Sequence, residues 1–397
     1  MSEFQASNFT KENGGTPDLL GKTELTSPYF FVPPSGNTAS RPQSCAPGTL
    51  RFNTDHGSLE VFRGDTIGWE QIQRAESQYL GGDSANSVIT TSTNSNRGTG
   101  VRGLTMSSND GAAGSESNVI EFITISTLGD MQDFGDLSIE TRQGTGFSSR
   151  TRAIQAGGFD GSNRKNNIEF VTIPSLGNAQ DFGDLQETRI GNPSGISNQT
   201  RGLVAAGENP GNTNDIDYIT IASTGNAVDF GHLSNAYQTG FAAGSPTRGI
   251  FAGGRGTPGY YNVIEFVTFT TTGDATDFGD LSDQKKGSGK GNASNSTRAI
   301  FCGEDKSGDT ITNVIDFITI ASTGNAIDFG DATSAITTVA NLFSPTRGVF
   351  SGGNNGSSNV NSIQFVTIAT TGNAADFGDC SQTNASRTGA TSGHGGL

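Results

Sequence analysis

The sequence is poor in charge and in tryptophan, and each shortage excludes a class of function. Of the 397 residues, 24 are Lys or Arg and 39 are Asp or Glu, so 16% are charged and the formal net charge is −15. Phosphate-binding surfaces need clustered Lys and Arg, which an acidic chain of this kind does not offer. The single Trp leaves little for stacking on bases. We therefore expect no nucleic acid among the partners.

Disulfide, targeting and membrane signals are also missing. The three cysteines, Cys45, Cys302 and Cys380, are odd in number and form no CxxC pair, which predicts small apolar residues without a disulfide framework. The first residues contain no basic segment followed by an apolar run, and no stretch of 18 residues is apolar throughout, so we expect neither a signal peptide nor a transmembrane segment. The three histidines lie far apart without metal-ligand spacing, and no cofactor is expected.

Glycine and phenylalanine are abundant instead, with 57 Gly and 25 Phe. A Gly inside a helix costs about 1 kcal/mol relative to Ala, which disfavours a helix bundle. The composition predicts an all-β protein whose core consists of small residues, Ile, Val and Phe.

The chain contains an internal repeat. One phrase occurs six times, as IEFITISTLGDMQDFGD, IEFVTIPSLGNAQDFGD, IDYITIASTGNAVDFGH, IEFVTFTTTGDATDFGD, IDFITIASTGNAIDFGD and IQFVTIATTGNAADFGD. The Asp before each Phe-Gly is Asp133, Asp181, Asp229, Asp277, Asp328 and Asp376, at intervals of 48, 48, 48, 51 and 48 residues. A second phrase precedes each copy and is clearest in TRGIFAGG from Thr247. A fixed period of this length is typical of arrays built from one repeated supersecondary unit.

One repeat reads as four strands. Residues 239–244 and 248–254 form short apolar runs separated by Ser-Pro-Thr, followed by residues 263–269 and, after the pair Gly273-Asp274, residues 276–281. A Gly followed by Asn or Asp suits a tight hairpin turn, and the pair recurs in all six copies. Each repeat is therefore predicted to be a four-stranded antiparallel unit.

The third strand of the repeat is apolar on both faces, because an Ile and an aromatic lie two residues apart on one face, with further Ile, Val or Phe on the other. Sheets stacked radially cover both faces of such a strand. Four strands per unit and six copies predict a six-bladed β-propeller, with solenoid stacking as the alternative. The Gly-Gly after the second strand resembles the kelch blade, although the Phe of DFGD stands where a kelch blade carries Trp.

The chain ends are predicted to meet. Residues 388–393 (TGATSG) are similar to the first strand at residues 239–244 (TGFAAG), yet no further repeat follows them. We expect this segment to complete the first blade, whose own upstream stretch, residues 91–100, is a poor strand. A seventh, degenerate blade from residues 79–100 and the tail stays open as an alternative.

Two recurrent charged positions are candidate structural sites. An acidic residue beside the strand aromatic would be costly to bury unpaired, and the Arg of the TRG phrase is its expected partner within the same blade. If Ala252 opposes Val263, Arg248 lies diagonal to Glu265. The Arg positions are Arg102, Arg152, Arg201, Arg248, Arg298 and Arg347, and the acidic positions are Glu121, Glu169, Asp217, Glu265 and Asp316, with Gln364 in the last copy.

The DFGD phrase invites two other interpretations. Its first three letters match the magnesium-binding motif of protein kinases, but the chain has no Gly-rich phosphate loop and no catalytic HRD. A ring of calcium sites is disfavoured because His232 replaces the second Asp of the third copy and the pairs would lie far apart. We expect these Asp side chains to accept backbone hydrogen bonds at turns.

The N-terminal part differs from the repeats. Residues 1–44 form a polar, Pro- and Gly-containing stretch around YFFVPP and are predicted to be an extended arm, residues 45–78 a small β-meander, and residues 79–397 the propeller. GTPDLLGKTELTSPYFFVPPSGNTASRP followed by PGTLRFNTDHGSLEVFRGDTIGWEQIQ resembles the leading segments of virion structural proteins of tailed bacteriophages, particularly phages of marine cyanobacteria. The ending SGHGGL is similar to the tail of kelch-like phage proteins.

This resemblance implies a non-enzymatic virion component of the tail, baseplate or fibre apparatus, assembled in the host cytoplasm and present in several copies. The N-terminal region would dock on other virion proteins through Tyr29, Phe30, Phe31 and Trp69. The propeller loops, rich in Asn, Ser, Gly and Thr, would decorate the particle or contact a host-surface glycan or protein. A head-decorating protein is the alternative within the structural class, and a polysaccharide-degrading tail-spike propeller is the alternative among enzymes.

Overall fold

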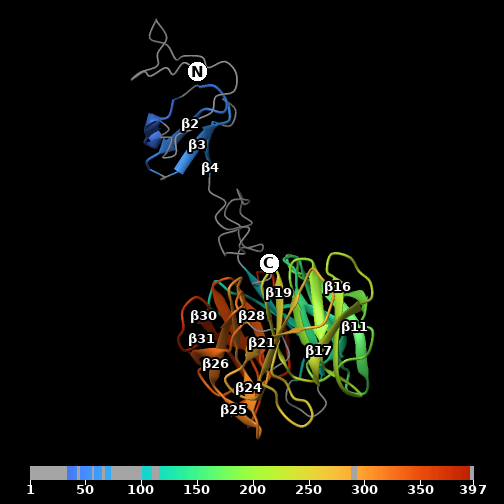
Figure 1. Cartoon of the computed structure of the whole chain (residues 1–397). Helices are drawn as coiled ribbons and strands as arrows, with labels where there is room; N and C mark the ends of the chain where they lie inside the picture. The colour runs from blue at the N-terminus through green and yellow to red at the C-terminus, as the bar shows by residue number, and fades with distance from the viewer. Residues whose placement is uncertain are drawn as a thin grey trace, which may run out of the picture. The chain divides into compact units, whose positions relative to one another are not determined.

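The computed structural model divides the chain into two compact units, Met1–Arg74 and Ala75–Leu397 (Figure 1). Their boundary lies close to the one predicted after residue 78. No helix within the described part of the chain is long and apolar enough to cross a membrane. The structure describes residues 34–42, 45–55, 58–64, 68–72, 101–109, 116–287 and 293–393.

The N-terminal unit contains one sheet of four strands in the order β1-β2-β3-β4. Its elements are β1 (Ser35–Gly36), the 3₁₀ turn η1 (Thr38–Ser40), β2 (Leu50–Asn53), β3 (Ser58–Phe62) and β4 (Trp69–Ile72). Strand β1 runs parallel to β2, and the other pairs are antiparallel. The meander predicted from residue 45 is present, but the predicted boundary at residue 44 is wrong, because β1 and η1 belong to this sheet unit. A two-residue strand is too short for periodicity to reveal it.

The repeat unit is all-β and consists mainly of antiparallel sheets. Six of its sheets carry the repeated phrases, and we number them in chain order. Sheet 1 contains β5 (Arg102–Met106), β6 (Ser108–Asn109), β7 (Glu116–Thr124), β8 (Gln132–Thr141) and β32 (Thr388–Thr391); sheet 2 contains β9 (Thr145–Ser148), β10 (Arg152–Phe159), β11 (Arg164–Thr172) and β12 (Gln180–Asp184); sheet 3 contains β13 (Ser194–Ser197), β14 (Arg201–Ala205), β15 (Glu208–Asn209), β16 (Gly211–Thr220) and β17 (Val228–Tyr237).

Sheets 4 and 6 have the four strands predicted for each repeat, whereas sheet 5 has three among the described residues. Sheet 4 contains β18 (Phe241–Gly244), β19 (Arg248–Ala252), β20 (Val263–Thr268) and β21 (Thr276–Asp280); sheet 5 contains β23 (Arg298–Phe301), β26 (Val314–Thr319) and β27 (Ile327–Asp331); sheet 6 contains β28 (Ala340–Phe343), β29 (Arg347–Ser351), β30 (Val360–Thr367) and β31 (Ala375–Asn384). A smaller sheet is formed by β22 (Lys285–Lys286), β24 (Glu304–Lys306) and β25 (Thr310–Thr312). All four strands predicted for the fourth repeat are therefore present.

Two details of the predicted repeat are wrong. Ala252 pairs with Ile264, so that Arg248 lies opposite Thr268, one residue away from the predicted register. The Gly-Asp pair at residues 273–274 is not a tight hairpin turn, because seven residues, 269–275, connect β20 to β21. Only the Gly uses positive φ, at 151° for Gly273.

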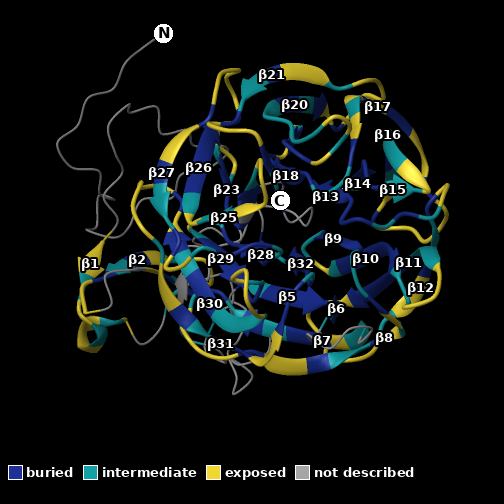
Figure 2. Ribbon diagram, turned by 90° about the horizontal axis from the view of Figure 1, so that it is seen from below, coloured by how far each residue is buried: buried dark blue, intermediate teal, exposed yellow. Residues whose placement is uncertain are grey.

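Hydrophobic clusters lie between neighbouring sheets, as the two apolar faces of the third strand predicted. In the cluster between sheets 4 and 5, Ile250 and Ile264 of one sheet contact Phe301 and Ile318 of the next. Five further clusters join sheets 1 and 2, 2 and 3, 3 and 4, 5 and 6, and 6 and 1. Figure 2 shows the sheets around a common centre, with β9, β13, β18, β28 and β32 innermost.

The C-terminal strand belongs to the first repeat sheet. β32 pairs with β5 in antiparallel register, Thr388 opposite Met106 and Thr391 opposite Gly103, which confirms the pairing predicted for residues 388–393. The segment at residues 79–100, proposed as part of a seventh blade, lies outside the described residues.

The innermost strands pack with little room between them. A Cβ added to Gly389 on β32 would lie 2.2 Å from the backbone oxygen of Asn341 on β28. A Cβ added to Gly146 on β9 would lie 2.7 Å from the oxygen of Gly389. Small residues are required here because backbone, which cannot rotate away, occupies the space.

We therefore expect Gly389→Ala to destabilise the repeat unit by about 1–3 kcal/mol through overpacking. Urea unfolding followed by far-UV circular dichroism measures the change, because most of the strands belong to the repeat unit. Gly259→Ala is the matched control, since an added Cβ there meets no atom within 4 Å. Equal stability of the two variants would contradict the tight packing of the inner strands.

Candidate functional site

The six recurrent Arg side chains join each sheet to the next one. The guanidinium of Arg248 lies over the ring of Phe266 in its own sheet, 4.6 Å from the ring centroid, and its Nη1 donates to the carbonyl oxygen of Ile320 in sheet 5 at 2.9 Å. The same two contacts recur at the other five positions. The acceptors are Ile173 for Arg102, Ile221 for Arg152, Phe269 for Arg201, Ile368 for Arg298 and Ile125 for Arg347.

The predicted pairing of this Arg with the acidic residue of the same repeat is wrong. The carboxylate of Glu265 accepts a hydrogen bond from the backbone nitrogen of Ser234 in sheet 3, at 3.0 Å. Arg248 instead faces sheet 5. Because the true register is shifted by one residue, the two side chains lie on opposite faces of sheet 4.

The side chain at each acidic position pairs with a residue of the preceding sheet or of the connection between that preceding sheet and its own. In sheets 1, 3 and 5 the partner is a buried cation. In sheets 2, 4 and 6 it is the backbone nitrogen and hydroxyl of a Ser or Thr. The cation pairs are Glu121 with Arg387, Asp217 with Arg189 and Asp316 with Lys285; the others are Glu169 with Ser138, Glu265 with Ser234 and Gln364 with Thr333.

Burial without a cation changes the titration of two of these groups. Glu169 and Glu265 are 3% and 4% exposed, and desolvation raises the pKa of both carboxyls. Gln364 occupies the same position in sheet 6 and accepts from the nitrogen and hydroxyl of Thr333 at 2.7 and 3.0 Å. A neutral group therefore fits this environment.

The DFGD phrase forms a seam between sheets. Gly177 of sheet 2 donates its N–H to the oxygen of Phe134 in sheet 1 at 2.9 Å, and a Cβ on Gly135 would lie 2.5 Å from the oxygen of Gly177. Asn178 accepts from the backbone nitrogen of Asp136. The side chain that accepts the backbone hydrogen bond is thus the Asn or Asp after the turn Gly. The prediction had given this role to the carboxylates of the DFGD phrase. His232 fits in the third copy because the seam uses its backbone nitrogen, which donates to Asp274, while its ring Nδ1 lies 3.2 Å from the carboxylate of Asp215.

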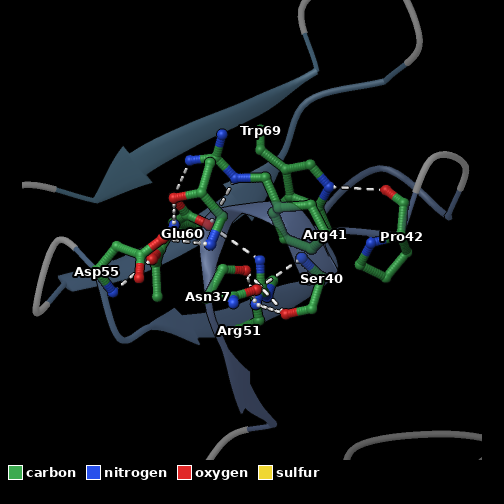
Figure 3. A network of polar contacts seen from close by, with 10 residues as sticks. Asn37, Ser40, Arg41, Pro42, Arg51, Asp55, Glu60 and Trp69 are labelled. Carbon is green, nitrogen blue, oxygen red and sulfur yellow. Dashed lines mark hydrogen bonds and ion pairs between the residues drawn. The ribbon is translucent and has the colours of Figure 1, made fainter.

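A buried carboxylate organises the N-terminal unit (Figure 3). Glu60 is fully buried and accepts hydrogen bonds from Arg41 and from Asn53, while Arg51 lies 3.5 Å from its second oxygen. The hydrogen bonds from Arg41 hold the pKa of Glu60 below its usual value. Arg51 also donates to Ser40 at 3.2 Å. The network binds residues 37–41 to one face of the sheet.

The predicted docking residues divide into two groups. Tyr29, Phe30 and Phe31 lie outside the described residues. Trp69 lies on the covered face, where its Nε1 donates to the oxygen of Pro42 at 3.0 Å and its ring packs against Phe62 with centroids 5.4 Å apart.

The opposite face of this sheet is apolar and open. Leu50 and Leu59 are 43% and 38% exposed, and the register places Val61 opposite Leu50 and Phe52 opposite Leu59, so all four side chains share one face. This face was not predicted from the sequence. The alternation of Leu59 and Val61 with Glu60 and Phe62 could have revealed it.

A polar cleft of about 730 Å³ lies between sheets 3 and 4. Sheet 3 supplies the β15–β16 hairpin and residues 234–236 of β17, and the connection after β19 supplies the opposite wall. The lining residues are Glu208, Pro210, Gly211, Asn212, Ser234, Asn235, Ala236, Gln238, Arg255, Gly256, Thr257 and Tyr261. Amide, hydroxyl and charged groups thus converge on a space of the size that small-molecule sites have.

Arg255 of the cleft occupies a position at which five of the repeat sheets share the same backbone bridge but carry different side chains. Arg255 forms a bridge with Gln238, and the corresponding bridges in four other sheets follow the same pattern. The residues at this position are Asn109 in sheet 1, Phe159 in sheet 2, Glu208 in sheet 3, Arg255 in sheet 4 and Asn354 in sheet 6. Variation on a fixed framework is typical of recognition loops.

Within the described ranges, no group of three or more His, Cys, Asp or Glu side chains could hold a metal ion. No disulfide joins Cys45, Cys302 or Cys380 to another described residue. No protein-family model matches the chain, and no curated protein is significantly similar to it.

We expect Arg248→Met to destabilise the repeat unit by about 2 kcal/mol, because it removes a cation–π contact and hydrogen bonds to the next sheet. Differential scanning calorimetry measures the effect, with Arg255→Met in the same sheet as the control. In a double-mutant cycle, the effects of Arg248→Met and Glu265→Gln should add, since the side chains do not touch. A coupling well above experimental error would restore the predicted ion pair.

We expect Glu169→Gln and Glu265→Gln to raise the free energy of unfolding at pH 7. Because the folded-state pKa of each carboxyl is raised, its contribution to stability is complete below the unfolded value near 4.5 and is lost as pH rises through the folded value. Chemical unfolding from pH 4 to 8 should show the variants gaining on wild type as pH increases. The reverse substitution Gln364→Glu should cost on the order of 1–3 kcal/mol at pH 7.

Proposed function

We propose that this chain is a non-enzymatic structural component of a phage virion, associated with the tail, baseplate or fibre. Its repeat unit would be a closed, six-bladed, kelch-like β-propeller that displays variable loops, and its N-terminal region would attach it to other virion proteins. One observation carries the proposal. The repeated residues form their hydrogen bonds and apolar contacts with neighbouring sheets, whereas the side chains at the loop ends differ from one repeat to the next.

Three observations support ring closure. The Arg contacts pass from each sheet to the next and from sheet 6 back to sheet 1, where Arg347 donates to the oxygen of Ile125 at 2.8 Å. The seam at the DFGD phrase also returns, because Gly129 of sheet 1 donates to Phe377 of sheet 6. The last strand, β32, pairs with the first repeat strand, β5. An open superhelix would leave its two end sheets without these partners.

Attachment through the N-terminal unit is supported by its open apolar face. A monomeric sheet of this size gains nothing by exposing Leu50 and Leu59, whereas an apolar strip on another virion protein would bury them. The resemblance of residues 15–42 and 47–73 to leading segments of phage virion proteins points to the same end of the chain. The variable loops would then face outward as a decorating or host-contacting surface.

Fractionation of particles tests the location. In purified particles of a phage that encodes this chain, mass spectrometry of separated heads and tails should find it with the tails. Its recovery with heads alone would favour the head-decorating alternative. Its absence from purified particles would contradict a virion role altogether.

The ring and the attachment face need separate tests. A cryo-EM map should show six sheets around one axis; a seventh sheet from residues 79–100, or an open array, would contradict six-bladed closure. Leu59→Asp should prevent incorporation into particles, while Arg63→Ala, at an exposed ion pair of the same unit, should leave it unchanged. Release of reducing ends from host polysaccharide by the purified chain would favour the tail-spike enzyme instead.

A further inference from the structure

We propose that the cleft between sheets 3 and 4 binds an acidic glycan, with Arg255 as the group that holds its carboxylate or sulfate. This inference deepens the proposed display function and rests on it. It follows from the charge left free in the cleft, from the rigidity of the backbone that carries this charge, and from the polar groups around it.

Arg255 is the free cation of the cleft. Its side chain is exposed, and its guanidinium has no ion pair or hydrogen bond among the described residues. Glu208, the acidic residue of the cleft, is already paired with Arg164 of sheet 2 at 2.6 Å. Asp309 acts electrostatically on Arg255, but its carboxylate accepts hydrogen bonds from Tyr260 and from Lys286. Lys286 also pairs with Asp305 at 2.9 Å, so the charges around Arg255 are nearly balanced. What the cleft offers a ligand is the guanidinium of Arg255, whose N–H donors have no partner within the described part of the chain.

The backbone of Arg255 is held on both sides. Its nitrogen donates to the oxygen of Gln238 at 2.8 Å, and its oxygen accepts from the nitrogen of Gln238 at 3.0 Å and from Nδ2 of Asn212 at 3.1 Å. The loop that follows is closed by Gly256 N–H donating to Gly259 and by the Tyr261 hydroxyl donating to Thr257. Little backbone ordering is therefore left to oppose binding, and the remaining entropic cost is that of fixing the Arg255 side chain. Its planar guanidinium loses less freedom for each hydrogen bond formed than an ammonium group does.

The other lining groups favour a sugar over an acidic peptide. Asn235 and Gln238 line the cleft with Arg255, and their amides can both donate and accept, as neighbouring sugar hydroxyls require. An extended acidic peptide would offer backbone groups that need a free sheet edge or a row of donors. A guanidinium binds a carboxylate or sulfate through two parallel hydrogen bonds, which is the expected contact here.

The test is isothermal titration calorimetry of the full chain with four probes of similar length. The probes are oligogalacturonate, a sulfated glucan oligomer, a neutral glucan oligomer and oligoglutamate. Binding of either charged saccharide, with the neutral oligomer and oligoglutamate at least about tenfold weaker, is expected. The carboxylated and sulfated arms identify which acidic group the cleft prefers.

Variants connect binding to the site. Arg255→Ala should weaken binding about tenfold, Arg255→Lys less, and Arg63→Ala, which removes an equal charge from the N-terminal unit, should not change it. Melting curves of the variants verify that they fold. Failure of both acidic saccharides to bind, equal binding of oligoglutamate, or indifference to Arg255→Ala would each overturn the proposal. None of these results changes the particle fractionation, so failure of the glycan site and failure of the virion role are distinguishable.

Discussion

Each repeat sheet depends on its neighbour for both its apolar faces and its polar groups. The guanidinium of Arg248 needs a carbonyl of sheet 5, and the turn at Gly273 needs the oxygen of Phe230 in sheet 3. A sheet with an apolar core on each side cannot be stable alone, because one exposed face would lose the burial that holds it together. The roles of the repeated residues are therefore determined by contacts between sheets. The sequence of a single strand does not reveal which neighbouring residue each side chain will contact.

This dependence leaves the loop ends free to differ. The backbone bridge that holds Arg255 also holds Asn354 two sheets further on, yet one side chain is a cation and the other a neutral amide. The contacts between sheets and the differing side chains are carried by different positions of the same repeat, so substitutions at the loop ends can change the exposed chemistry without disturbing the cores. That separation favours a display role for the unit.

The sequence predicted the strands well and their partners poorly. Period, strand order and the pairing of residues 388–393 with the first repeat follow from repetition and alternation, which are visible in one dimension. The Arg–carboxylate pair was wrong because it depended on a one-residue register, and a slip of one residue moves a side chain to the other face. The partners of Glu121 and Asp217 come from non-repeated connections, Arg387 and Arg189, which no periodic pattern marks. The cleft arises from two neighbouring sheets and has no linear signature.

The overall charge of −15 opposes the approach of an acidic ligand. Such a ligand therefore needs a site at which the local charges favour it. At physiological ionic strength, charges more than about 8 Å apart are largely screened, so the field of the whole chain matters less than the groups in contact. A cation that is free, exposed and carried on a fixed backbone can then hold an anion on an acidic protein, and a guanidinium does so through two parallel hydrogen bonds. In the cleft between sheets 3 and 4, Arg255 meets these conditions because Arg164 neutralises the Glu208 carboxylate beside it. Local pairing, more than net charge, decides which ligands an acidic scaffold accepts.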